Sequence, residues 1–152
     1  MSSLVLDVVA RWKVSGTNLN LFIVEQFPII SPHSYSEWNV EFISKRVSKL
    51  IYTTDSLQEF SEDMGMSGPP FVFDALGRAQ IRAELDALFA KLYGLSREDL
   101  QYILDPSSVM GDDYPSETFR VLKENEQRDF GEYRTQRLVL DAWDALVPNE
   151  LN

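Results

Sequence analysis

The sequence contains no cysteine and only one histidine, His33. The lack of cysteine excludes disulfide bonds, zinc–thiolate sites, iron–sulfur clusters and thiol catalysis. His33 lies in a segment rich in proline and serine, with no second histidine to share a metal ion, so we interpret it as a solvent-exposed loop residue. We therefore expect no metal and no cofactor to be bound by this chain itself.

Long apolar runs are also missing. No run approaches the 18 residues that a membrane-spanning helix needs, and no basic segment followed by an apolar one resembles a secretory signal. The 152 residues are 44% apolar and 25% charged, which is typical of an ordinary globular protein rather than a disordered one. We expect a cytoplasmic protein that makes no contact with a membrane.

The common catalytic motifs are absent. The sequence lacks the GxSxG, GxxxxGK[ST] and GxGxxG patterns of hydrolases, P-loop proteins and dinucleotide-binding enzymes. None of its five lysines lies two residues after an acidic residue, which is the spacing of many metal-dependent nucleases. The isolated chain is therefore not expected to be an enzyme.

The segment GPPF (residues 68–71) is similar to one catalytic motif but lacks its key side chain. Enzymes that methylate amino groups of DNA place Asn, Asp or Ser before Pro-Pro and an aromatic residue, and the first side chain holds the amino group of a flipped base. Gly68 has no side chain to accept that hydrogen bond. We interpret GPPF as a rigid turn between helices.

The net charge of −10 argues against a nucleic-acid-binding module that acts alone, because acidic surfaces repel phosphate. The acid is unevenly spread, since residues 1–50 are close to neutral. Side chains in this first part are candidates for contacts with the DNA backbone, and the alternative is that they are simply solvated. The candidates are Arg11, Lys13, Thr17, Asn18 and Asn20.

Apolar periodicity predicts a mainly α fold, a helical bundle with a short β segment near the N-terminus. A central helix is expected from Asp74 as its N-cap to Gly94 at its C-terminal end, with an apolar stripe at Ile81, Leu85, Leu88, Phe89 and Leu92. Ser96 and Asp99 predict a capping box for the next helix.

The remaining segments are assigned from spacing and turn residues. Residues 4–12 predict a helix capped by Ser3, and residues 19–27 predict the short strand. Further helices are expected at 36–51, 55–65, 116–128 and 131–146, with a polar loop at 105–115. For the first of these, capped by Ser36, the inner face is predicted to be Val40, Ile43, Val47, Leu50 and Ile51, and for the last it is Val139, Ala142, Trp143 and Leu146.

Six segments, read together, resemble one protein family. They are DVVARWKVSGTNLN (7–20), FIVEQFP (22–28), GPPF (68–71), RAELDA (82–87), LYGL (92–95) and FGEYRTQR (130–137). Their order is similar to the C-terminal target-recognition and helical-tail region of large N6-adenine DNA methyltransferases, which occur in type IIG restriction–modification enzymes and phage-exclusion systems. The likeness spans nearly the whole chain.

The resemblance implies two parts: residues 1–34 as the end of a target-recognition module with its linker, and residues 35–152 as a helical C-terminal domain. It implies that the chain works with a methyltransferase core of the same system, which binds S-adenosylmethionine, and that it meets DNA in the assembled enzyme. We then expect an expressed fragment, a separate small subunit or the remnant of a split gene.

The sequence departs from the family pattern at several points, and it also permits a second interpretation of the function. Trp12 and Ser15 occupy positions where family members commonly have Gln and Gly, and the catalytic tetrapeptide and cofactor loop are missing. The alternative is a stand-alone acidic helical adaptor or a DNA-mimicking regulator, which the net charge favours.

Overall fold

The computed structural model describes residues 3–14, 16, 19–115 and 118–146, and every regular element in these ranges is helical. The expectation of a mainly α fold is therefore confirmed. No helix in these ranges is long and apolar enough to cross a bilayer. The α-helices are α1 (Leu4–Lys13), α2 (Leu21–Val24), α3 (Glu37–Ile51), α4 (Gln58–Asp63), α5 (Ala75–Leu92), α6 (Arg97–Leu104), α7 (Ser107–Met110), α8 (Arg120–Phe130) and α9 (Arg134–Ala145), and the short 3-10 helices are η1 (Pro32–Ser34) and η2 (Asp55–Leu57).

The ends of the central helix α5 form as the sequence predicts. The Asp74 carboxylate accepts hydrogen bonds from the backbone N–H groups of Leu76 and Gly77, each at 3.0 Å. At the other end Gly94 adopts a left-handed conformation with φ of 73°. The Leu95 N–H then donates to the Ala90 carbonyl at 3.1 Å, which completes a Schellman motif. The capping box of Ser96 and Asp99 at the start of α6 is also confirmed.

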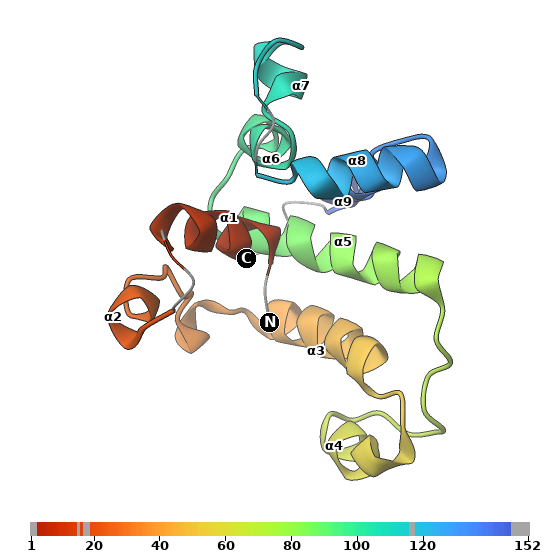
Figure 1. Cartoon of the computed structure of the whole chain (residues 1–152). Coiled ribbons are helices and arrows are strands. Elements are labelled where there is room, and N and C mark those ends of the chain that lie inside the picture. The colour runs from red at the N-terminus through yellow and green to blue at the C-terminus, as the bar shows by residue number, and fades with distance from the viewer. Residues whose placement is uncertain (1–2, 15, 17–18, 116–117, 147–152) are drawn as a thin grey trace.

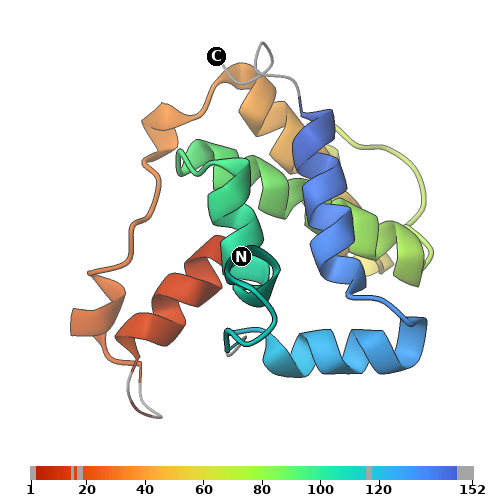
Figure 2. The same cartoon turned by 90° about the horizontal axis from the view of Figure 1, so that it is seen from above.

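Helix α5 lies in the middle of the molecule, with α3 on one side and α9 on the other (Figures 1 and 2). Its second half is buried on almost every side: Leu88, Ala87 and Ala90 have no exposed surface. The alanines let neighbouring helices approach closely, since a helix with small side chains packs at a short interaxial distance. Val139 and Ala142 of α9 are buried in these contacts, and Trp143 and Leu146 pack beside them as predicted.

The predicted strand at residues 19–27 is wrong, because this segment contains the helical turn α2. The Asn20 side chain caps the turn by accepting a hydrogen bond from the Ile23 N–H at 3.1 Å. A strand needs a neighbouring strand to pair with, and none lies in the described ranges. Leu21 and Phe22 are each 71% exposed, so the apolar content that suggested a buried strand faces solvent.

Three other details of the helices differ from the prediction. Val40 and Ile51 are exposed on α3, and its buried side instead carries Asn39 and Ser48. Trp38 and Phe42, whose tilted rings have centroids 4.8 Å apart, pack with Ile43 against the core cluster of Ala87, Leu88, Ala142 and Leu146. Gly131, with φ of 77°, ends α8 rather than beginning α9, and the segment expected to be a polar loop contains α7.

Tyr52 holds both ends of the GPPF turn. Its hydroxyl donates to the Gly68 carbonyl at 2.9 Å, and its own carbonyl accepts from the Phe71 N–H at 2.9 Å. The rings of Tyr52 and Phe71 meet edge to face. Gly68 has φ of 121°, which L side chains rarely adopt, so glycine serves this turn through its backbone.

Helix α1 packs within the main helical core. Its Val5 belongs to the same buried cluster as Ala83 of α5, Leu100 of α6 and Val139 of α9. The predicted helix at 4–12 and its Ser3 cap are confirmed. The division of the chain at residue 34, which came from the family resemblance, stays a prediction.

The capping box gives a direct test of the fold. Replacing Ser96 with Ala removes the hydroxyl that accepts from the Asp99 N–H, and we expect the free energy of unfolding to fall by about 1 kcal/mol. The measurement is urea denaturation at constant m-value. Ser31→Ala is the matched control, since Ser31 precedes η1 without making a side-chain cap. Equal decreases in the free energy of unfolding of the two variants would contradict the role of the Ser96 cap.

Candidate functional site

Of the five residues predicted to contact DNA, three lie in the described ranges. Arg11 and Lys13 are in the last turn of α1, and Asn20 caps α2. Thr17 and Asn18 lie outside the described residues. The Arg11 Nε donates to the Asp7 carboxylate at 3.0 Å, and its guanidinium is 5.7 Å from the centre of the Phe119 ring. The structure therefore places two cations at one end of α1, with the charge of Arg11 partly neutralised.

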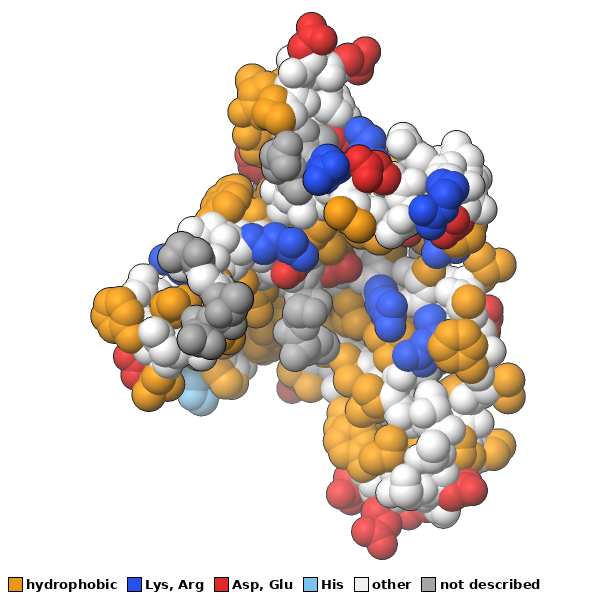
Figure 3. Space-filling model, viewed as in Figure 1, with side chains coloured by type: hydrophobic (Ala, Val, Ile, Leu, Met, Phe, Trp, Pro, Cys, Tyr) orange, Lys and Arg blue, Asp and Glu red, His pale blue; other side chains and the backbone are white. Residues whose placement is uncertain are grey.

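The segment that follows, residues 19–29, forms what we call the apolar arm. It lies at one edge of the molecule in both ribbon views, and hydrophobic side chains gather on it in the space-filling view (Figures 1, 2 and 3). Leu19, Leu21, Phe22 and Ile29 are each more than half exposed. The Tyr93 hydroxyl ties the arm to α5 by donating to the Pro28 carbonyl at 2.8 Å. Grouped apolar exposure of this kind marks interaction surfaces.

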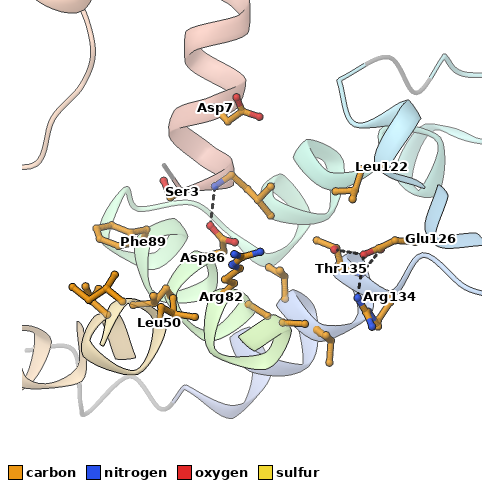
Figure 4. A pocket seen from close by; sticks show the side chains of 18 residues that line it. Ser3, Asp7, Leu50, Arg82, Asp86, Phe89, Leu122, Glu126, Arg134 and Thr135 are labelled. Carbon is orange, nitrogen blue, oxygen red and sulfur yellow. Dashed lines mark hydrogen bonds and ion pairs between the residues drawn. The ribbon is translucent and has the colours of Figure 1, made fainter. Parts of the chain in front are cut away.

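Five helices enclose a cleft of about 910 Å³ (Figure 4). Its walls are mostly aliphatic, with side chains from α3, α5, α8 and α9. Its polar lining comes mainly from α1, α5 and the facing ends of α8 and α9. The polar residues are Ser3, Asp7, Arg82, Asp86, Glu126, Arg134 and Thr135. Sequence reasoning did not single out this group.

Asp86 joins the cleft to the start of α1. Its Oδ1 accepts a hydrogen bond from the Leu4 N–H at 2.8 Å, at the end of the helix where carboxylates are favoured. Burial nevertheless raises the pKa of Asp86 to about 6, and this effect exceeds the lowering by the Leu4 hydrogen bond and by the charge of Arg82. The spacing of the central helix alone does not predict this contact, because tertiary packing sets the position of α1.

Glu126 occupies the opposite side of the cleft and fastens the start of α9 to α8. Its two carboxylate oxygens accept from the backbone N–H and from the hydroxyl of Thr135, each at 2.7 Å. The Arg134 guanidinium lies 3.8 Å from the centre of the Phe130 ring and 4.0 Å from Glu126. Its Nε is buried and has no hydrogen-bond partner among the described residues. The Arg134 Nε is therefore shielded from solvent between the Phe130 ring and the wall of the cleft.

The chemistry of the cleft suits binding. It offers aliphatic contact along its walls and guanidinium groups at Arg82 and Arg134. A carboxyl group with a raised pKa inside a cleft is a pattern found at catalytic sites. At Asp86, however, the same carboxyl holds the first turn of α1, which gives it a structural task. No cluster of potential metal ligands lies in the parts of the chain that the structure describes.

Comparison with known proteins adds no assignment: no protein-family model, curated protein or solved structure matches this chain. The family resemblance given by the six sequence segments therefore stays an expectation.

The raised pKa of Asp86 predicts how stability depends on pH. The native state holds this proton more tightly than the unfolded chain, whose aspartates have a pKa near 3.8, so the stability due to Asp86 is lost as the pH rises from about 4 to about 6. At pH 8 we expect Asp86→Asn to unfold with a free energy on the order of 1–3 kcal/mol higher than the wild type, because the amide avoids burying a charge and its oxygen still accepts from Leu4.

The measurement is chemical denaturation of both proteins at pH 4 and pH 8. Asp112→Asn, at an exposed turn residue, removes the same charge and supplies the baseline. At pH 4 the native Asp86 is protonated. There the increase in the free energy of unfolding of Asp86→Asn, relative to Asp112→Asn, should vanish. A variant that is equally destabilised at both pH values would show that the carboxylate form stabilises the fold.

Proposed function

We propose that this chain is the C-terminal target-recognition and scaffold part of an adenine-specific DNA methyltransferase of a restriction–modification or phage-defence system, without chemistry of its own. The observation that carries the proposal is the apolar arm, whose exposed side chains include Leu21 and Phe22. A partner protein that covers the arm would remove this apolar surface from water. That burial stabilises the complex by about 25 cal/mol per Å² of apolar surface. The arm also lies where the resemblance places the end of the recognition module.

The two cations at the end of α1 support a position beside DNA. Arg11 and Lys13 lie shortly before the arm in sequence, so a methyltransferase core that covers the arm would bring DNA close to them. The acidic helix α4 would face away, because its exposed carboxylates repel phosphate. In this assembly the core binds S-adenosylmethionine and performs the methyl transfer, in the cytoplasm where the DNA is.

A second candidate, an acidic adaptor or DNA-mimicking regulator, is favoured by the net charge of −10. Acidic side chains gather over α4 in the space-filling view (Figure 3). The exposed acids of this helix and the turn before it are Asp55, Glu59, Glu62 and Asp63. A regulator of this kind would occupy the DNA-binding surface of its partner and displace DNA.

Fluorescence anisotropy with labelled random duplex DNA at low salt separates the two candidates. The methyltransferase core from the same source is measured alone and then with the purified chain. A recognition and scaffold part increases the affinity of the core for DNA, whereas a DNA mimic decreases it. Unchanged affinity, together with no binding between chain and core, would contradict both.

A double substitution tests the cations. We expect Arg11→Ala with Lys13→Ala to weaken DNA binding by the assembled system by about tenfold at 0.1 M salt, because two phosphate contacts are lost. The slope of log K against log salt concentration should become shallower by about 2. The measurement is a salt titration of the anisotropy signal.

Lys45→Ala with Lys49→Ala is the matched control. Lys45 pairs with Glu41 one turn earlier, as Arg11 pairs with Asp7, and Lys49 lies in the last turn of its helix, as Lys13 does. Both double variants remove two positive charges and one exposed ion pair. Identical salt slopes in the two would show that Arg11 and Lys13 do not contact DNA.

A further inference from the structure

The segment between α3 and α5 folds back on itself and forms what we call the acidic lobe, residues 53–74. Tyr52 closes the lobe, because its hydroxyl and its carbonyl hold the two ends of the GPPF turn. Within the lobe, the Met66 N–H donates to the Ser61 carbonyl at 2.9 Å. Among the helices, α4 packs chiefly against η2, and it lies apart from α9 and from the apolar arm (Figure 1). The lobe is therefore a separate surface with its own internal contacts.

The charge of this region has one sign. Residues 50–77 contain five acidic residues and no lysine, arginine or histidine. All five are exposed, and none forms an ion pair with the part of the chain that the structure describes. Five uncompensated carboxylates attract cations and repel phosphate. These residues are Asp55, Glu59, Glu62, Asp63 and Asp74.

Exposed apolar side chains accompany these carboxylates. Val72 is 92% exposed, and most of the surface of Phe73 and Leu76 is also exposed. Phe60 and Met64, at α4, each expose more than a third of their surface. Hydrophobic and acidic side chains gather together over α4 and the segment that leads to α5 in the space-filling view (Figure 3). The lobe therefore offers apolar contact and negative charge on the same surface.

The size of this apolar surface indicates what can cover it. Since a fully covered aromatic side chain buries about 150–250 Å², the exposed parts of these five side chains amount to on the order of 500 Å². Apolar patches of about 300–600 Å² on monomers are often functional. A stable dimer buries about 800 Å² on each partner, and two lobes facing each other would also bring like charges together. A second copy of this chain does not fit the lobe, whereas a short peptide segment does.

We propose that the acidic lobe binds a short, positively charged peptide segment of a partner protein. Apolar side chains of this segment cover Val72, Phe73 and Leu76, and its lysines or arginines face the carboxylates of α4. The charge of the lobe excludes nucleic acid and anionic membrane surfaces, because both present phosphate. The lobe is distinct from the apolar arm and from the cations of α1, so this inference does not rest on the proposed function.

The test uses the full chain and a fluorescent synthetic peptide of about 14 residues, in which leucines at i, i+3, i+4 and i+7 are flanked by lysines. Fluorescence anisotropy measures its dissociation constant. We expect a peptide with the same lysines, but with serine in place of leucine, to bind at least about tenfold more weakly, because it buries no apolar surface on the lobe. A peptide with the leucines retained and glutamate in place of lysine should not bind.

A pair of charge variants locates the site. Glu62→Gln with Asp63→Asn should weaken binding of the leucine–lysine peptide by at least about fivefold, because two carboxylates that face its lysines are lost. The matched control is Asp112→Asn with Asp113→Asn, which also neutralises two adjacent exposed acids and leaves the chain with the same net charge. This control should bind the peptide as the wild type does.

A pair of valine variants tests the apolar contact. Val72→Ser should weaken binding by at least about fivefold, because the peptide loses an apolar side chain to cover. Val121→Ser makes the same substitution at a position of α8 that is 62% exposed, and it should leave the affinity unchanged. Both valines are exposed, so neither substitution opens a cavity in the core.

The inference is overturned if the leucine–lysine peptide does not bind, or if a lobe variant and its control weaken binding equally. It is also overturned if the serine peptide binds as tightly as the leucine peptide, which would show attraction to negative charge alone, as a DNA mimic would give. The assay contains neither methyltransferase core nor DNA, so its failure is distinct from failure of the proposed function.

Discussion

The rest of the structure depends on the burial of α5 on nearly all sides. Its second half alternates large side chains with alanines, and Ala87 and Ala90 are as fully buried as Leu88. A helix with a single apolar stripe packs on one neighbour, but α5 must be covered from several directions at once. Helices α1, α3 and α9 provide that cover, so their positions follow from the need to remove α5 from water.

This requirement separates what the sequence predicts from what it does not. Caps are local, so Asp74, Gly94 and the pair of Ser96 and Asp99 end or begin helices where their side chains predict. The segment at 19–27 has the composition of a strand, but strand preference depends on pairing with another strand. No partner strand lies in the described ranges. The Asn20 cap and local backbone hydrogen bonds therefore determine that the segment forms a helical turn.

The cleft was beyond sequence reasoning for a related reason. Asp86 and Leu4 are 82 positions apart, and their hydrogen bond exists only because α1 lies across α5. Glu126 and Thr135 are nine positions apart, on two helices joined by the left-handed turn at Gly131. Here part of a signal was present, since a glycine such as Gly131 commonly marks the end of a helix. Glu126, the partner of Thr135, was still not identifiable, because several nearby acids were equally placed in sequence.

Helix α1 connects the cleft to the two cations that the proposed function places beside DNA. Ten residues span about 15 Å, so its first turn lies in the cleft at Asp86 while its last turn carries Arg11 and Lys13 beside the arm. In the proposed assembly, the methyltransferase part covers the apolar arm, and DNA meets the end of α1 that carries Arg11 and Lys13. The buried side chains of Val5 and Val8 fix α1 against the hydrophobic core of this chain. The packing of α1 on α5 and α6 therefore determines where the two cations lie on the molecule.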